Sequence, residues 1–191
     1  MLAGELRAQE SNSLTGCTSS NNSIEISKGW PDGSQTTYTF WDTSGLNEGE
    51  LGSMPAPAAG TTLCDLLREH SVNLIIYGIR GSRLTDIVRV NYDLVSGIVR
   101  KKKVPIVLVV TGLEQEENMD DWWKKNKEII KKMGLASAFD GYACVTTMKG
   151  KNGIHWRVYQ ESANKVWMLV KKICHPTTTL EPQIAKTVRI L

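Results

Sequence analysis

Two nearly continuous apolar runs constrain the fold of this chain more than any other feature. Residues 72–79 read Val-Asn-Leu-Ile-Ile-Tyr-Gly-Ile and residues 105–110 read Pro-Ile-Val-Leu-Val-Val, as expected of strands that are buried on both faces. Between them, apolar residues from Leu84 to Val99 recur at helical spacing. Because parallel strands need a crossover connection, this alternation predicts an α/β domain, a three-layer and mostly parallel sheet with helices on both faces.

The rest of the chain adds an edge hairpin, further helices and a short strand to this plan. Ser23–Ser27 and Thr36–Trp41 alternate in polarity around a turn at Gly33, which predicts an antiparallel hairpin. We expect helices at residues 62–70, 118–133 and 159–173, and a strand at residues 142–145. The plan is one domain over residues 1–174 and a C-terminal tail over residues 175–191, where the pattern is too weak to assign an element.

Composition narrows the class of protein. The 191 residues are 41% hydrophobic and 23% charged, as in one soluble globular domain, and the net charge of +3 is too small to imply a nucleic-acid partner. No apolar run reaches the length of a membrane span, and the N-terminus lacks the pattern of a signal peptide. We therefore expect a cytoplasmic protein without a transmembrane segment.

The cysteines and histidines are scattered. No Cys-x-x-Cys pair occurs, so the four cysteines are expected to be reduced thiols in neither a disulfide framework nor a zinc site. No histidine lies near another candidate ligand in sequence, so none is assigned to a metal or a catalytic role. These residues are Cys17, Cys64, Cys144 and Cys174, and His70, His155 and His175.

Polar groups follow three of the expected strands. The first strand ends in Asp42-Thr43-Ser44-Gly45, the next in Thr111-Gly112-Leu113-Glu114, and the last in Thr146-Thr147. The carboxyl ends of strands are where an open α/β sheet binds ligands. There a carboxylate can hold Mg²⁺, usually through water, and a glycine lets a backbone amide approach a phosphate. For Asp42 the alternative is an ordinary strand-to-turn exit in which the carboxylate satisfies backbone amides.

The order of these motifs, with Gly16-Cys17-Thr18 upstream, resembles the GTP-binding domain of the translation-factor-related P-loop GTPase class. The resemblance runs from about residue 1 to residue 173 and is strongest to fungal GTPase-like proteins with a "G domain". It implies that Thr18 meets Mg²⁺ and the terminal phosphate, that Asp42 binds Mg²⁺ through water, and that Gly45 offers its amide to that phosphate.

The same resemblance implies a base-recognition region. Glu114 would hydrogen-bond the guanine edge, Thr111 would support its loop, and Thr146 and Thr147 would lie in a loop against the base. Gly112 stands where the motif usually has lysine or a larger residue that covers the base. The alternatives are that Thr18 is a plain loop residue and Thr146 a strand end.

Two departures from the family pattern bear on activity. The phosphate loop Gly-x-x-x-x-Gly-Lys-Ser/Thr is absent, so the family's first strand and phosphate loop are expected before Met1, in an N-terminally truncated chain. That strand would occupy the sheet centre, and its loss would leave a gap between Thr36–Trp41 and Val72–Ile79. Leu46 follows Gly45 where Ras-like proteins carry a water-positioning glutamine, so no catalytic residue is assigned.

A lysine-rich helix over residues 122–132 carries two tryptophans. A nucleic-acid face would use its lysines for phosphates and its aromatic rings for stacking. The alternative is an amphipathic helix with a solvated lysine face, since Asp121 and Glu128 interleave. We favour the alternative and expect no nucleic-acid partner.

Two functions remain. In the first, the chain binds GTP or GDP with Mg²⁺, hydrolyses GTP slowly and signals to a protein effector whose identity the sequence does not give. In the second, it is a nucleotide-free interaction module of the same shape, or a non-functional fragment of a GTPase. Oligomeric state is not predicted.

Overall fold

The computed structural model describes residues 22–42, 61, 64–65, 67–68, 71–82, 86–99, 103–135, 139–174 and 186–190. The first half contains strands β1 (Asn22–Gly29), β2 (Gln35–Asp42) and β3 (Val72–Arg80), and helix α2 (Asp86–Val99). The second half contains β4 (Ile106–Thr111), α3 (Asp121–Lys132), β5 (Gly141–Cys144), a short 3-10 helix (Lys151–Gly153), α4 (Trp156–Cys174) and β6 (Lys186–Ile190). The described residues between 61 and 68 are helical.

The strands form one mixed six-stranded sheet in the order β1-β2-β6-β3-β4-β5. The pairing of β1 with β2 is antiparallel, and every other neighbouring pair is parallel. The predicted hairpin is confirmed, with Gly33 at φ +81° in its turn and Trp30 N donating to Ser34 O at 2.8 Å. The predicted mixed α/β sheet with helices is therefore confirmed.

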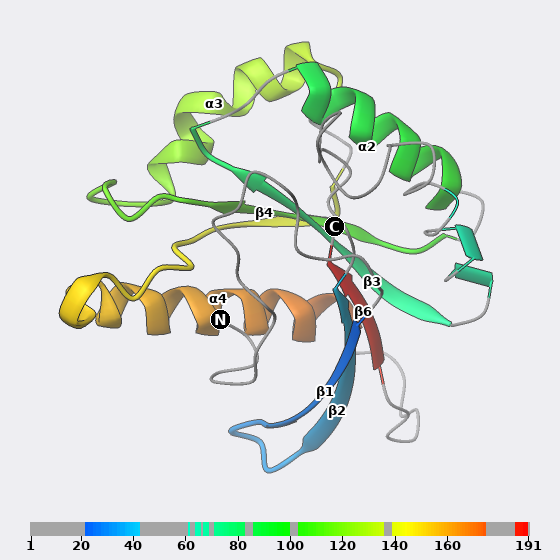
Figure 1. The fold of residues 1–191 in the computed structure, drawn as a ribbon, viewed down its shortest axis with the longest axis horizontal. Coiled ribbons are helices and arrows are strands. Elements are labelled where there is room, and N and C mark those ends of the chain that lie inside the picture. Colours follow the sequence, from blue (N-terminus) through cyan, green and yellow to red (C-terminus); the bar gives the residue numbers. More distant parts are fainter. Residues whose placement is uncertain are drawn as a thin grey trace.

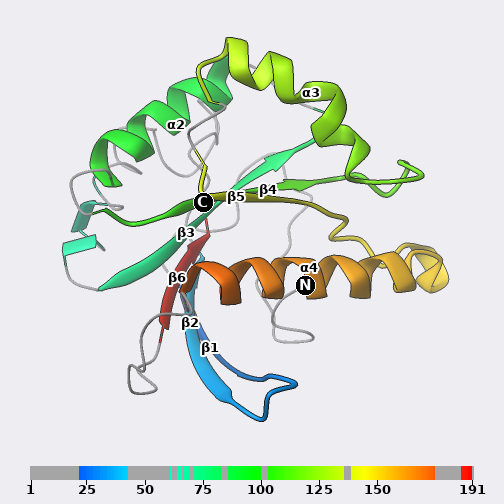
Figure 2. The ribbon, with the colours of Figure 1, turned by 180° about the vertical axis from the view of Figure 1, so that it is seen from behind.

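The core lies on both faces of this sheet, because successive strand residues point to opposite faces. On one face, Ile75 and Tyr77 of β3 share a buried cluster with residues of α2 and α3, such as Val95 and Ile130. On the other face, Leu74 and Ile76 of β3 share a second cluster with α4 and the hairpin. Figures 1 and 2 show α2 and α3 above the sheet and α4 below it.

The second cluster is aromatic where the hairpin meets α4. Trp167 of α4 meets Tyr38 and Phe40 of β2 edge to face at 5.2 and 5.6 Å between ring centroids. Trp30, in the hairpin turn, meets the same indole at 6.3 Å. The hairpin is thereby fixed to α4 by ring contacts that add to the burial of apolar area.

Strand β6 occupies the centre of the sheet. It pairs in parallel with β2 on one side and β3 on the other, and Val188 is fully buried between them. Thr187 N also donates to Asn73 Oδ1 at 2.9 Å, at the register shift between Val72 and Leu74. The expected gap between the hairpin and β3 is therefore wrong: residues from the C-terminal segment fill it (Figure 1).

Candidate functional site

Five strands, β2, β6, β3, β4 and β5, share one direction, so their carboxyl ends meet at one edge of the sheet. Among the residues predicted to bind a ligand, Asp42 and Thr111 end β2 and β4 at this edge, and the others that the structure describes follow β4 and β5. The structure describes Asp42 only as a backbone position, the last residue of β2, paired with Ile190 of β6. Thr18 and Gly45, which are predicted to contact Mg²⁺ and the terminal phosphate, lie outside the described residues.

The loops after β4 and β5 meet at a direct contact between Glu114 and Thr146. The Thr146 hydroxyl donates to Glu114 Oε2 at 3.2 Å and accepts from Met148 N at 3.1 Å. It also lies 3.5 Å from the Met148 carbonyl oxygen, but one hydroxyl proton serves the nearer and charged carboxylate better. Thr146 is fully buried, and Thr147 beside it is exposed.

Thr111 and Gly112 shape the start of the Glu114 loop. The Thr111 hydroxyl donates to Ile79 O at 3.1 Å, so it fixes the ends of β3 and β4 to each other. Gly112 follows at φ +76°, a left-handed conformation that costs other residues about 1–2 kcal/mol. The chain can therefore turn sharply between the strand end and Glu114.

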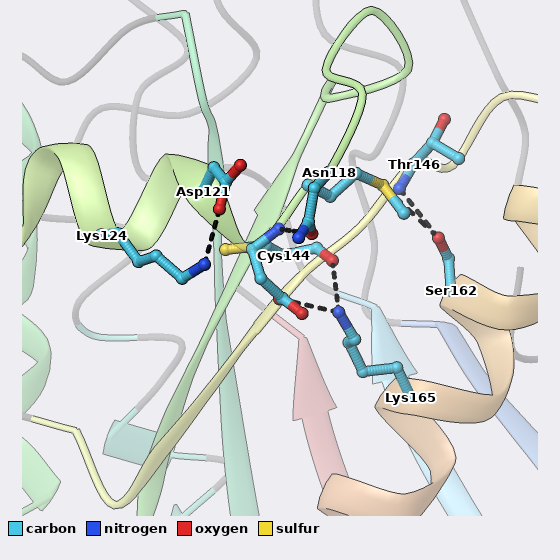
Figure 3. Close-up of polar contacts among 9 residues, drawn as sticks. Asn118, Asp121, Lys124, Cys144, Thr146, Ser162 and Lys165 are labelled. Carbon is cyan, nitrogen blue, oxygen red and sulfur yellow. Dashed lines mark hydrogen bonds and ion pairs between the residues drawn. The ribbon is translucent and has the colours of Figure 1, made fainter.

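Ser162 and Met119 support Thr146 from beneath. Thr146 N donates to Ser162 Oγ at 3.1 Å, and that hydroxyl lies 3.9 Å from Met119 Sδ (Figure 3). Ser162 belongs to α4 and is 1% exposed. In the sequence, Ser162 is recognisable only as a serine on the apolar side of the expected helix over residues 159–173. That signal does not distinguish this role from ordinary packing.

A lysine from α4 ties the same region together. Lys165 Nζ donates to Asp120 Oδ1 at 2.7 Å and to the Cys144 carbonyl at 3.4 Å (Figure 3). Asp120 directly precedes α3, and its backbone N–H donates to Asn118 Oδ1 at 3.1 Å. Both side chains of the ion pair are partly exposed. The pair therefore adds little to the stability of the fold, and its main effect is to position the N-terminus of α3. The sequence pattern gave no reason to select Lys165.

The Cys144 and Cys174 thiols are both buried. Burial raises the pKa of the Cys144 thiol to about 11 and the pKa of the Cys174 thiol to about 12. Both groups stay protonated near neutral pH, so neither thiol is activated as a nucleophile. Within the part of the chain that the structure describes, no three Cys, His, Asp or Glu side chains gather as a metal site would require.

The lysine-rich helix α3 uses its tryptophans for packing. Trp122 is 5% exposed and donates through Nε1 to Gly81 O at 2.9 Å, and Trp123 stacks on Tyr142 at 4.0 Å between centroids. Lys124 pairs with Asp121 at 2.7 Å. These contacts favour the reading of α3 as an amphipathic helix with a solvated lysine face.

Among the described helices, none is both long enough and apolar enough to cross a membrane. Comparison with protein-family models gave no match, and comparison with curated proteins gave none either.

Two solved structures of the GTPase Era resemble this fold. One is a variant of Aquifex aeolicus Era bound to GDP and AlF4⁻, with a TM-score of 0.51 and 16% sequence identity over 88% of this chain and 50% of that chain. The other is Era in complex with MgGDPNP and a segment of 16S ribosomal RNA, with a TM-score of 0.50 and 16% identity over 87% of this chain and 49% of that chain. The chain thus spans about half the length of these Era chains, and over that part its fold is similar to theirs.

Proposed function

We propose that this chain is a guanine-nucleotide-binding domain in which Glu114 recognises the base. The observation that carries the proposal is the hydrogen bond between Thr146 and Glu114, which joins two loops at the edge where this fold class binds ligands. Two loops that meet through a carboxylate can hold one planar ligand between them. The likeness to Era, solved with guanine nucleotides, supports the same reading.

The chemistry of Glu114 favours guanine over adenine. Its Oε2 accepts from Thr146, while Oε1 accepts no hydrogen bond from any residue in the described ranges. A carboxylate has further acceptor capacity, and guanine presents two neighbouring N–H donors, N1–H and the 2-amino group. Adenine has no N1–H and only its 6-amino group as a donor, so a free carboxylate oxygen discriminates against ATP.

The proposed contacts with Mg²⁺ and the terminal phosphate rest on the family resemblance. Asp42 would hold Mg²⁺ through water, with Thr18 as its second protein contact, and Gly45 would donate its backbone N–H to the terminal phosphate. Asp42 ends β2 at the same sheet edge as Glu114, which supports this division of roles. Slow GTP hydrolysis is part of the proposal, but no residue is assigned to it.

Contacts between the base and the loops that carry Glu114 and Thr146 would give only a modest affinity for guanosine. A guanosine has about 20 non-hydrogen atoms, and at roughly 0.3 kcal/mol for each atom it would bind with about 6 kcal/mol. That free energy corresponds to a Kd on the order of tens of micromolar. Phosphate and Mg²⁺ contacts would tighten the binding beyond this value.

The test is the substitution Glu114→Gln. Its amide oxygen can still accept from Thr146, which turns the NH2 group toward the ligand and replaces an acceptor by a donor. We expect about 10- to 100-fold weaker GDP binding, the value of one charge-assisted hydrogen bond, and a gain in binding of xanthosine diphosphate, whose base carries a carbonyl in place of the 2-amino group.

The matched control is Glu117→Gln, because Glu117 is exposed and lies three residues away in the same segment. Fluorescence titration with a labelled GDP, competed by each nucleotide, measures both effects. Equal GDP binding by the Glu114 and Glu117 variants would contradict the assignment of Glu114.

A second candidate function is a nucleotide-free interaction module. The absence of any Gly-Lys-Ser or Gly-Lys-Thr in the 191 residues favours it, because that loop supplies much of the phosphate binding in P-loop proteins. The two candidates predict opposite results in the same titration, since the module binds neither GDP nor GTP while remaining folded.

A further inference from the structure

The exit of β3 is held firmly beside the Glu114 loop. Gly81 N donates to Thr111 O at 2.8 Å, and the Thr111 hydroxyl donates to Ile79 O at 3.1 Å. Trp122 Nε1 donates to Gly81 O at 2.9 Å. These bonds fix the residues on both sides of Arg80, so the backbone of Arg80 is fixed as well.

The side chain of Arg80 runs along Gly112. A Cβ added to Gly112 would lie 3.1 Å from Arg80 Cγ and 3.2 Å from Arg80 Nε. Gly112 is also the residue with φ +76°, so its position favours glycine for two independent reasons. Arg80 thus occupies the space beside the loop that a side chain at position 112 would fill.

The guanidinium of Arg80 has no protein partner in the described ranges. The residue is exposed at the end of β3, and no ion pair or hydrogen bond of its side chain occurs there. Two other cations from the same edge are engaged. Lys165 pairs with Asp120, and Lys149 lies over the rings of Trp156 and Tyr159 at 5.4 and 5.5 Å.

We propose that Arg80 covers the purine face of the nucleotide whose edge Glu114 binds, and this inference rests on the function proposed above. Gly112 has no side chain with which to cover the base, and Arg80 at the end of the neighbouring strand β3 fills that role. The planar guanidinium suits it, since it stacks on aromatic faces, stays charged at every physiological pH and attracts the π-system of a base. Gly112 directly follows Thr111, and Glu114 comes two residues after Gly112.

The experiment compares Arg80→Ala with Arg68→Ala by titration with GDP and with guanosine. Arg68 is a matched control because it is an exposed arginine that precedes β3, at the opposite edge of the sheet. We expect Arg80→Ala to weaken both ligands by the same factor, about 5- to 30-fold, the range for a desolvated cation–π contact. Arg68→Ala should bind both ligands as the wild type does.

Each other result is decisive. A loss for GDP but not for guanosine would place Arg80 at the phosphates and overturn the base-covering role. Wild-type binding by Arg80→Ala would overturn the inference and leave the proposed function intact. Absence of GDP and guanosine binding by the folded wild type would overturn both. If Arg80→Ala fails to fold, Arg80→Lys replaces it, and the loss of the planar group should still weaken both ligands.

Discussion

Thr146 connects the two loops of the candidate site, the loop after β4 and the loop after β5. The buried Thr146 hydroxyl donates to Glu114 and accepts from Met148 N, and the backbone N–H of the same residue donates to Ser162. Because the Thr146 hydroxyl is fully buried, it would have no water to hydrogen-bond without these partners. The residue therefore affects both stability and the direction of the Glu114 carboxylate.

Thr146→Val tests this dual role. The valine keeps the shape but removes both hydrogen bonds of the hydroxyl, and we expect a loss of about 1–3 kcal/mol in the free energy of unfolding. Guanine-nucleotide binding should weaken as well, because Glu114 loses the donor that orients it. Thr146→Ser keeps the hydroxyl and should cost less than about 1 kcal/mol. Urea unfolding and GDP titration of both variants measure the effects, and equal values for Val and Ser would contradict this account.

A charged contact also holds the hairpin turn against α4. Lys171 of α4 donates to Asp32 Oδ2 at 2.7 Å, and Asp32 also accepts from the backbone N–H and hydroxyl of Ser34. Lys171 further lies 4.5 Å from the ring centroid of Trp30. The hydrogen bond from Lys171, followed by those from Ser34, holds the pKa of Asp32 well below its ordinary value of 3.8. The turn is thus fastened to α4 by charge as well as by aromatic contacts.

This lowered pKa predicts an acid-dependent stability. The folded state binds the Asp32 proton less tightly than the unfolded chain, so the contribution is complete above about pH 4 and is lost as the pH falls below it. Asp32→Asn should be less stable than the wild type at neutral pH, and the two should converge in acid. Lys171→Gln should reduce the same pH dependence. Denaturant unfolding between about pH 2 and 7 measures it, and a constant difference between wild type and Asp32→Asn would contradict the assignment.

The sequence predicts local elements well where their own pattern decides them. The buried runs that became β3 and β4, and the alternation on either side of Gly33, specify strands without help from distant residues. The start of α3 differs slightly from the expected range of residues 118–133. The Asn118 side chain accepts from Asp120 N in a turn, and the helix begins at Asp121. The strand β6 has only Val188 and Ile190 as apolar residues, and its place depends on the slot between β2 and β3.

The candidate site likewise combines residues that a local sequence pattern indicates with residues that only the tertiary structure brings together. Glu114 and Thr146 stand out as polar residues after strands, but they are 32 residues apart and only the sheet order brings them into contact. Ser162, Lys165 and Arg80 are ordinary residues in the sequence. Their importance arises from tertiary geometry, which no local pattern encodes.

Strand β6 joins the half of the sheet that contains the hairpin to the half that carries Glu114. Without it, β2 and β3 would face each other with unpaired backbone groups in the centre of the sheet. Val188→Asp places a charge where the side chain is fully buried, and we expect loss of cooperative unfolding or a cost above about 4 kcal/mol. Lys186→Ala, at the half-buried start of the same strand, should cost less than about 1 kcal/mol. Thermal unfolding compares the two, and a stable, cooperative Val188→Asp variant would show that β6 does not hold the sheet together.

Equilibrium binding of a fluorescent GDP analogue to the 191-residue chain, in the presence of Mg²⁺, measures whether this fold binds guanine nucleotides. We predict saturable binding with a Kd of tens of micromolar or tighter, displaced by GDP and GTP and not by ATP. A folded chain that shows no saturable binding up to about 1 mM, or one from which ATP displaces the probe as well as GTP does, would contradict the account.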